Sequence, residues 1–554
     1  MCIRDSPLTD VNRIIQRQDG IEELTGHTTE LSQLEEMLEH VFDFERILTR
    51  IEANTTSPKD LLALKASLGM IPEIKKLLSG TVSIVLRKLS DQMDIHSTVY
   101  ELLDRSMNEN GTGNIRDGKY IKEGYSAELD EVRSLSENSR KWIADLEERE
   151  KEKTGIKLKI GFNNVFGYYF EITNANKVPI PEYYMRKQTL VNAERYITPE
   201  LKEFETKALS AKEKTEELEL KIYQAVKAAI RPEIAAMQRT AKALAALDCL
   251  TGLSRAALKD RYVRPQITNS REGRISIHDG RHPMVEHALK REMFVPNDTE
   301  LNHTDQEMII ITGPNMAGKS TYMRQVAVLT IMAQTGSFIP AKSASFAPVD
   351  RIFTRVGAAD DISTGQSTFM VEMKEVSHIL CNATKNSLIL LDEIGRGTST
   401  YDGMSIARAV VEYLNSKVHA YTLFATHYHE LSDMAAENEH IKNYTVTVKE
   451  RGKEITFLRR IVPGSADKSY GIHVARLAGL PESLLKRADE ILEGLEVEGI
   501  KEEPAAPVIR RETALNLFSS PIIDELADLD VMSKTPIEAM EILFRLSKEA
   551  KEGR

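Results

Sequence analysis

A chain of 554 residues with 41% hydrophobic and 28% charged residues can form roughly three to five domains, and it is neither fibrous nor disordered as a whole. Its 73 Lys and Arg against 84 Asp and Glu give a formal charge of -11, so nucleic acid can be contacted only through a local basic patch. The longest apolar run, 326–333, is far short of the roughly 20 residues of a membrane helix, and three cysteines without paired spacing fit a reducing compartment. We therefore expect a cytoplasmic protein with no membrane partner.

The N-terminal part of the chain is predicted to be helical. Between residues 8 and 118 apolar residues recur at helical spacing, as in Leu61, Leu64 and Leu68, without a long interruption rich in glycine or proline. We assign residues 1–123 to the first part of an all-α core.

Two long helices are predicted next. From Leu201 to Ala225 apolar residues alternate steps of three and four, which is a coiled-coil pattern and gives a rod of roughly 37 Å. A second apolar stripe, from Leu129 to Leu146, precedes it with a more polar middle. We expect the two helices to pack antiparallel as a stalk, with residues 201–264 returning to the core.

Between the long helices the pattern changes to a period of two. Residues 156–162 and 168–172 alternate apolar and polar side chains around an Asn-Asn pair, which predicts a small β insertion within residues 124–200. Residues 151–200 carry eight Lys or Arg against five Asp or Glu. This excess fits a contact with a phosphate backbone, and an ordinary solvated surface explains it equally well.

Residues 265–496 are predicted to be an α/β region. The apolar strands 308–312 and 387–391 are each followed by a loop of Gly, Ser and Thr, a pattern typical of nucleotide-binding folds. Residues 497–515 are charged, contain prolines and are predicted to be a linker. Residues 516–554 are amphipathic and should form a small helical module that pairs with another surface.

The first of these strands leads into a phosphate-binding loop, or P-loop. Its sequence fits G-x-x-x-x-G-K-[S/T] in the required context of strand, loop and helix. Two glycines let the backbone amides face the phosphates, Lys319 should reach the β and γ phosphates, and Ser320 should bind Mg²⁺. The loop residues are Gly313, Pro314, Asn315, Met316, Ala317, Gly318, Lys319, Ser320 and Thr321.

Two further strands end in polar residues that fit the same chemistry. Strand 387–391 is followed by Asp392, which can hold Mg²⁺, and by Glu393, which can take a proton from the attacking water. An acid in the second position indicates hydrolysis rather than transfer to another substrate. His427 follows strand 422–425, where a γ-phosphate sensor would lie, although a lone His at a strand end is more often structural.

A helix is predicted to begin near Ser367 and to run to about Asn382. Ser367 fits a simple N-cap. The same exposed helix start could present its N–H groups and hydroxyl to a phosphate held by a facing subunit. The spacing does not distinguish the two readings.

These motifs closely resemble those of the MutS family of DNA mismatch-repair ATPases. The resemblance rests on GPNMAGKSTYMRQ at 313–325, DEIGRGTSTYDG at 392–403 and FATHYHEL at 424–431. Residues 183–203 resemble the family's DNA clamp and its return into the lever helix, and 467–481 resemble the helix-turn-helix that follows the ATPase. Nearly the whole chain is covered.

The resemblance implies a multidomain architecture and a composite nucleotide site. It implies an all-α core and lever with a small β clamp, then an α/β P-loop ATPase of the ATP-binding-cassette superfamily and a C-terminal helical module. ATP and Mg²⁺ would lie between the P-loop of one subunit and the signature helix of the other in a homodimer. The implied roles are a trans-acting signature at Ser367 and Thr368, a P-loop asparagine at Asn315, a switch histidine at His427, a turn arginine at Arg396 and an adenine-stacking aromatic at Phe294. A hydrophobic plug is the other reading of Phe294.

The family's mismatch-reading and connector domains are not visible in this sequence. We therefore expect contact with the backbone of double-stranded DNA through the clamp, with Arg186 and Lys187 as candidates, and no mismatch reading by this polypeptide. Residues 514–518 resemble a sliding-clamp-binding peptide, but Ala514 stands where Gln is expected, so we expect clamp docking to be weak. The family further implies a MutL homologue as partner, nucleoid association, and tetramers through the C-terminus.

The leading hypothesis is a DNA-dependent ATPase that acts as a nucleotide-switched clamp in mismatch repair. One alternative is a MutS branch that lacks the mismatch domain and suppresses recombination. The other is a scaffold that binds nucleotide only for assembly, against which the Asp392–Glu393 pair argues because a scaffold needs no general base.

Overall fold

The computed structural model describes residues 6–111, 113–163, 167–269, 273–289, 293–314, 317–356, 368–451, 454–465, 471–499, 542 and 545. The chain divides into two compact units, Met1–Val474 and Ala475–Arg554. The predicted linker beyond residue 499, the peptide at 514–518 and nearly all of the predicted module at 516–554 lie outside the described residues.

The first helices and α9 share one hydrophobic core. Leucines and isoleucines at helical spacing give each helix an apolar face, and the faces meet around Ile21, Leu48, Leu64, Leu103 and Leu247, which are inaccessible to water. This confirms the predicted helical pattern. The helices are α1 Val11–Gly26, α2 Thr28–Glu39, α3 Phe44–Glu52, α4 Pro58–Leu78, α5 Ile84–Gln92, α6 Ser97–Ser106 and α9 Ile234–Lys259.

The helical prediction, which extends to residue 118, is wrong from residue 107 onward, because no α-helix is present among the described residues of the segment 107–126. Helix α6 ends at Ser106, Met107 forms an isolated bridge with Ile121, and the other described residues of the segment form a loop with one 3₁₀ turn at Ile115–Asp117. The segment contains four glycines, three of which have positive φ, a conformation that α-helices do not contain. The loop connects the core to the first long helix.

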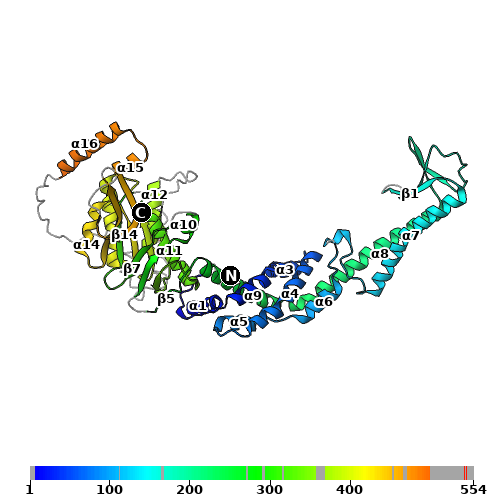
Figure 1. Ribbon diagram of the computed structural model, residues 1–554, viewed down its shortest axis with the longest axis horizontal. Coiled ribbons are helices and arrows are strands. Elements are labelled where there is room, and N and C mark those ends of the chain that lie inside the picture. Colours follow the sequence, from blue (N-terminus) through cyan, green and yellow to red (C-terminus); the bar gives the residue numbers. More distant parts are fainter. Residues whose placement is uncertain are drawn as a thin grey trace. The chain divides into compact units, whose positions relative to one another are not determined.

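The long helices are α7, Ala127–Thr154, and α8, Pro199–Ile230. They lie side by side and antiparallel (Figure 1), with Trp142 of α7 stacked on Phe204 of α8 at 3.8 Å between ring centroids. Helix α8 extends beyond the predicted apolar pattern at both ends, because Thr198 caps its first turn and its last turns join the helical core. The predicted antiparallel pair is therefore present.

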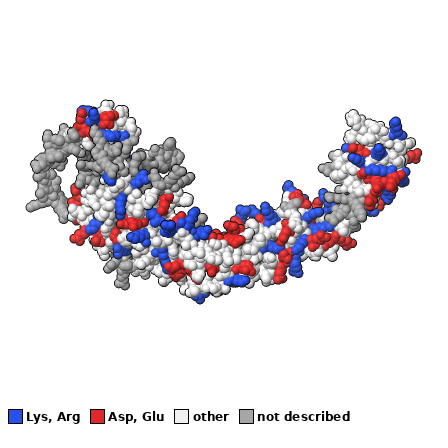
Figure 2. All heavy atoms as spheres, in the orientation of Figure 1, with Lys and Arg blue, Asp and Glu red and all other residues white. Residues whose placement is uncertain are grey.

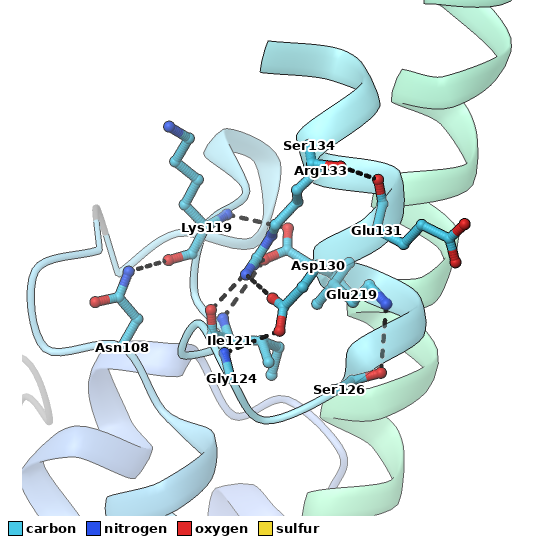
Figure 3. Close-up of polar contacts among 11 residues, drawn as sticks. Asn108, Lys119, Ile121, Gly124, Ser126, Asp130, Glu131, Arg133, Ser134 and Glu219 are labelled. Atoms are coloured by element: carbon cyan, nitrogen blue, oxygen red, sulfur yellow. Dashed lines mark hydrogen bonds and ion pairs between the residues drawn. The ribbon is translucent and has the colours of Figure 1, made fainter. Parts of the chain in front are cut away.

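A buried acid fixes the base of this helix pair (Figure 3). Glu219 of α8 accepts the backbone N–H of Lys119 at 3.0 Å and of Ile121 at 3.5 Å, and it pairs with the guanidinium of Arg133 on α7. Arg133 also donates to the Ile121 carbonyl at 3.0 Å. The carboxylate thus joins α7, α8 and the loop that precedes α7.

The predicted β insertion is an antiparallel sheet at the other end of the pair. Its strand order is β1-β2-β4-β3, and its inner side chains pack with Leu146 of α7 and Leu201 of α8 in a small core. The strands are β1 Leu158–Asn163, β2 Gly167–Thr173, β3 Met185–Thr189 and β4 Ala193–Ile197.

The α/β region is built on a six-stranded sheet of order β10-β11-β12-β8-β13-β14, parallel except for the last pair. Side chains of β8 alternate between two cores: Ile309 and Ile311 face α11, while Met308 and Ile310 face the α12 and α13 side. Helices on both faces explain why this strand is apolar throughout. The elements are β8 Met308–Thr312, α11 Lys319–Thr335, β10 Ile352–Arg355, α12 Thr368–Asn382, β11 Leu388–Asp392, α13 Thr400–Tyr413, β12 Tyr421–Ala425, α14 Met434–Glu437, β13 Ile441–Arg451 and β14 Glu454–Pro463.

A smaller sheet of order β5-β9-β6-β7 adjoins α11 through the same core. Its strands are β5 Gln266–Ile267, β6 Arg274–Gly280, β7 Asn297–Asn302 and β9 Ser343–Phe346, with α10 Pro283–Ala288 between β6 and β7. Helix α1 contacts the end of α11, where Arg17 donates to the Thr335 carbonyl at 2.9 Å. The helical core and the α/β region are therefore joined directly.

Two helices follow the larger sheet, α15 Gly471–Leu477 and α16 Glu482–Gly499, separated by a turn at Gly479. Within the second unit, Arg476 lies 3.6 Å from Glu482 and 3.7 Å from Asp489. In the described part of the chain, no helix combines the length and the apolar character needed to cross a bilayer.

Candidate nucleotide-binding site

The P-loop motif lies at the carboxyl end of β8, between Thr312 and Lys319, as the sequence predicts. Gly313 and Gly318 have φ of +133° and +103°. Residues other than glycine rarely adopt such backbone angles, so both glycines are needed for the turn. Gly318 directly precedes α11, which points the free N–H groups of the helix start toward the loop. Asn315 and Met316 lie outside the described residues.

Lys319 folds back over the loop. Its Nζ donates to the Gly313 carbonyl at 2.5 Å and to the Pro314 carbonyl at 3.2 Å. Burial lowers the pKa of the Lys319 ammonium to about 8, because desolvation outweighs the attraction of Glu393 and Asp392. An anionic ligand in the loop would add negative charge beside this buried cation and offset the cost of its desolvation.

Ser320, at the start of α11, and Asp392, at the end of β11, form a hydrogen-bonded pair. The Ser320 hydroxyl donates to Asp392 Oδ2 at 2.5 Å, although β12 separates β8 from β11. The other oxygen, Oδ1, is buried and has no hydrogen-bond partner among the described residues. Burial raises the pKa of the Asp392 carboxyl. A hydroxyl and an open carboxylate oxygen are the donors that Mg²⁺ uses beside nucleotide phosphates, so these residues fit that ion.

Glu393 lies at the same edge of the sheet with a strained backbone, φ +56°. Its carboxylate accepts from His427 Nε2 at 2.5 Å and pairs with the guanidinium of Arg396. The hydrogen bond from His427, together with the charge of Arg396, holds the pKa of Glu393 below its ordinary value. The sequence assigned separate roles to these three residues, and the structure brings their side chains together.

A cavity of about 190 Å³ lies beside the start of α11. Phe294 lines it together with Thr321 and Tyr322 of α11, so this aromatic lies beside the helix that follows the P-loop. Arg459 of β14 also lines the cavity, and sequence reasoning missed it because no motif surrounds a residue this far from the P-loop. Of the two predicted signature residues, Ser367 lies outside the described residues, and Thr368 is the exposed first residue of α12.

Comparisons with known proteins show which family the chain resembles. The family model MutS domain V matches residues 309–496, from β8 to α16, and the model MutS family domain IV matches residues 124–214, which contain α7, the β insertion and half of α8. Together the two models match just over half of the chain. The chain belongs to the MutS family.

Individual relatives extend the likeness to almost the whole chain. It is 48% identical to the DNA mismatch repair protein MutS of Caldicellulosiruptor bescii over 98% of this chain and 64% of that protein. The corresponding values for MutS of Clostridium kluyveri are 47%, 99% and 64%, and for MutS of Syntrophomonas wolfei 48%, 98% and 63%. The chain thus spans somewhat less than two thirds of the length of these MutS proteins.

The predicted DNA contacts belong to the segment that matches MutS domain IV. This segment is separate in sequence from the residues of the nucleotide site. Arg186 and Lys187 lie on β3, exposed to solvent, and Arg186 pairs with Glu194 at 3.1 Å. Lys187 lies at a shift of register between Arg186 and Gln188. Arg195, by contrast, stacks on the ring of Tyr169 at 4.2 Å and is less available. On the face shown in Figure 2, acidic and basic side chains are interspersed over the helical core.

Proposed function

We propose that this chain is a DNA-dependent ATPase that acts as a nucleotide-switched clamp on duplex DNA in mismatch repair. The observation that carries the proposal is the pairing of Ser320 with Asp392, whose second oxygen is open, directly beside Glu393. A Mg²⁺ donor set and a carboxylate one residue later are what hydrolysis of a nucleotide requires. The proposal does not assign mismatch reading to this chain.

Nucleotide binding rests on the P-loop and the neighbouring cavity. The backbone amides of the loop and Lys319 bind the β and γ phosphates, and Phe294 stacks on the adenine. Mg²⁺, held by Ser320 and Asp392, would neutralise charge on the phosphates when bound. The buried, poorly compensated ammonium of Lys319 supports this assignment, since binding of a phosphate relieves its cost of burial.

Hydrolysis is assigned to Glu393 with His427 as the sensor. While His427 donates to Glu393, the carboxylate is a weak base because its pKa is held down. If His427 turns to a γ-phosphate oxygen, Glu393 loses that hydrogen bond and becomes better able to take the proton of the attacking water. The contact seen between the two side chains therefore fits a resting state that the nucleotide releases.

The proposed assembly is a homodimer in which Ser367 and Thr368 of one subunit face the nucleotide of the other, with Arg396 near the contact. Further association to tetramers through residues 516–554 and an interaction with a MutL homologue follow from membership of the family. Arg186 and Lys187 on β3 are proposed to contact DNA phosphates, which position the duplex without reading its sequence.

The test is ATP hydrolysis by the purified chain without DNA, with a matched duplex, and with a duplex containing one G·T mismatch, at low and moderate salt. We expect equal stimulation by both duplexes and a loss of stimulation as salt rises, because phosphate contacts release counterions. Replacing both Arg186 and Lys187 by Ala should weaken this stimulation and leave the DNA-free rate unchanged. Selective stimulation by the mismatch would contradict the expectation that this chain lacks a mismatch reader.

Glu393→Ala separates the proposal from the scaffold alternative. The variant should bind ATP as tightly as the unchanged chain and hydrolyse it about 10² to 10⁴ times more slowly, since only the proton acceptor is removed. Rates from single-turnover hydrolysis and affinities from a fluorescent nucleotide measure the two effects. Normal hydrolysis by the variant would refute the role of Glu393.

A further inference from the structure

Helix α12 is tied to the turn after Glu393 by a buried acid. Glu372, one turn into α12, is 5% exposed, and its Oε1 accepts the backbone N–H of Gly395 at 2.6 Å. Its other oxygen lies 3.6 Å from the guanidinium of Arg355, the last residue of β10. A buried carboxylate needs such partners, so the position of Glu372 is well defined.

The backbone of Gly395 is held from two further sides. Its carbonyl accepts the hydroxyl of Tyr428 at 3.1 Å, and Tyr428 directly follows His427. On the third side Gly403 of α13 is so close that a Cβ on Gly395 would lie 2.5 Å from the Gly403 carbonyl oxygen. Gly395 also has φ +89°, so no other residue fits readily. The peptide is therefore fixed by α12, by α13 and by the segment that carries the proposed sensor.

This fixed point lies within the proposed catalytic turn. Glu393 is two residues before Gly395, and Arg396, which pairs with Glu393, is one residue after it. The first turn of α12 touches the same turn again, because a Cβ on Gly397 would lie 3.0 Å from the Cβ of Phe369. A displacement of α12 is thus transmitted to the backbone that carries Glu393. Displacing a reacting group by about 1 Å can cost on the order of 10²-fold in rate.

We propose that Glu372 is a positioning residue for ATP hydrolysis, which holds Glu393 in place through Gly395 and couples it to α12. The proposal rests on the proposed ATPase function. It adds a route of regulation, because α12 begins at the signature residues that are proposed to face the nucleotide of the other subunit. A nucleotide there, by moving α12, would change hydrolysis at Glu393 of this chain.

The experiment compares three variants of the full chain by the kcat and KM of ATP hydrolysis and by the affinity for fluorescent ADP. Glu372→Ala should lower kcat about 10- to 100-fold and leave KM and ADP affinity within about twofold. Glu372→Gln keeps an oxygen that can accept from Gly395, so it should retain most of the rate. Glu375→Ala is the matched control: Glu375 pairs with the same Arg355 at 3.0 Å, is about half exposed, and its ion pair does not involve the turn, so kcat should not change.

Tyr428→Phe provides a second test of the inference if Glu372→Ala does not fold. This variant removes only the hydrogen bond to the Gly395 carbonyl and should lower kcat about 3- to 10-fold at unchanged ADP affinity. An unchanged kcat in Glu372→Ala or in Tyr428→Phe, or an equal loss of kcat and ADP binding, would overturn the inference. A complete lack of hydrolysis by the unchanged chain would instead overturn the proposed function.

Discussion

Glu219 is a buried carboxylate and Asp392 a half-buried one with one buried oxygen, and their hydrogen bonding differs. Both oxygens of Glu219 have partners, namely two backbone N–H groups and the guanidinium of Arg133 (Figure 3). Asp392 accepts one hydrogen bond, from Ser320, and its second oxygen has no partner in the described part of the chain. The first acid is completed by the chain itself, and the second is left for a ligand to complete.

The physical reason is the cost of removing a carboxylate from water. That cost is recovered in the folded protein only where enough donors surround the oxygens, as they do around Glu219. At Asp392 it is not recovered, and burial accordingly raises the pKa of the carboxyl. Acids of the first kind stabilise a fold, whereas acids of the second kind mark binding sites.

Among the variants that test this comparison, Asp392→Asn should have the largest effect, and the effect should be on ATP hydrolysis. We expect ATP hydrolysis to fall about 10³-fold, because the site loses the charge that holds Mg²⁺ against the phosphates. The melting temperature without nucleotide should stay the same or rise slightly, since an incompletely solvated charge is removed. Hydrolysis assays and thermal unfolding with and without Mg²⁺-ATP measure both. A marked drop in the melting temperature of the nucleotide-free variant would mean that Asp392 is a structural acid like Glu219.

Glu219→Ala should show the opposite behaviour. The change leaves Arg133 and two backbone N–H groups without their acceptor, which we expect to destabilise the base of the helix pair by about 3 kcal/mol. Amide hydrogen exchange at Lys119 and Ile121 should accelerate accordingly. ATP hydrolysis without DNA should remain within about twofold, because Glu219 lies outside the nucleotide site.

Arg149→Ala is the control for that effect. Arg149 pairs with Glu200 between the same two helices, but the side chains are 56% and 51% exposed. Removing this pair should change stability by less than about 0.5 kcal/mol. If the exposed and the buried pair cost the same, burial would not be the cause of the difference.

The pH dependence of ADP binding tests whether the buried charge of Lys319 is also completed by a ligand. The expected effect is smaller than those above. Lys319 has a pKa of about 8 without a phosphate, so it is charged below pH 8 and increasingly neutral above it. A bound phosphate favours the charged form of Lys319, so the complex should take up close to one proton when ADP binds above pH 8. The affinity for ADP should therefore fall as the pH rises above 8, by up to about tenfold per pH unit. Calorimetry in buffers of different ionisation enthalpy detects this uptake. Affinity that is constant from pH 7 to 9.5 would contradict the assignment of Lys319.

Local features of the site and fold could be predicted from the sequence because neighbouring residues determine them. The two P-loop glycines, the strands 308–312 and 422–425, and the apolar stripes of α7 and α8 need only backbone conformation and side-chain periodicity. The end of α6 at Ser106 was missed because apolar residues at helical spacing continue beyond it, although the segment 107–126 carries glycines with positive φ. Positions along the chain thus revealed which residues belong to the candidate site, including Lys319, Asp392 and Glu393.

The partners of those residues depend on the tertiary structure. Ser320 meets Asp392 because the sheet order brings the ends of β8 and β11 to one edge around β12. Periodicity tells which face of a strand is buried but not which strands become neighbours, so the contact of Glu393 with His427 and the position of Arg459 had no local signal. The same holds for Glu219 and Glu372. The sequence alone determined the elements and the chemistry of their ends, and the packing of distant elements decided which charges are satisfied and which are left for a ligand.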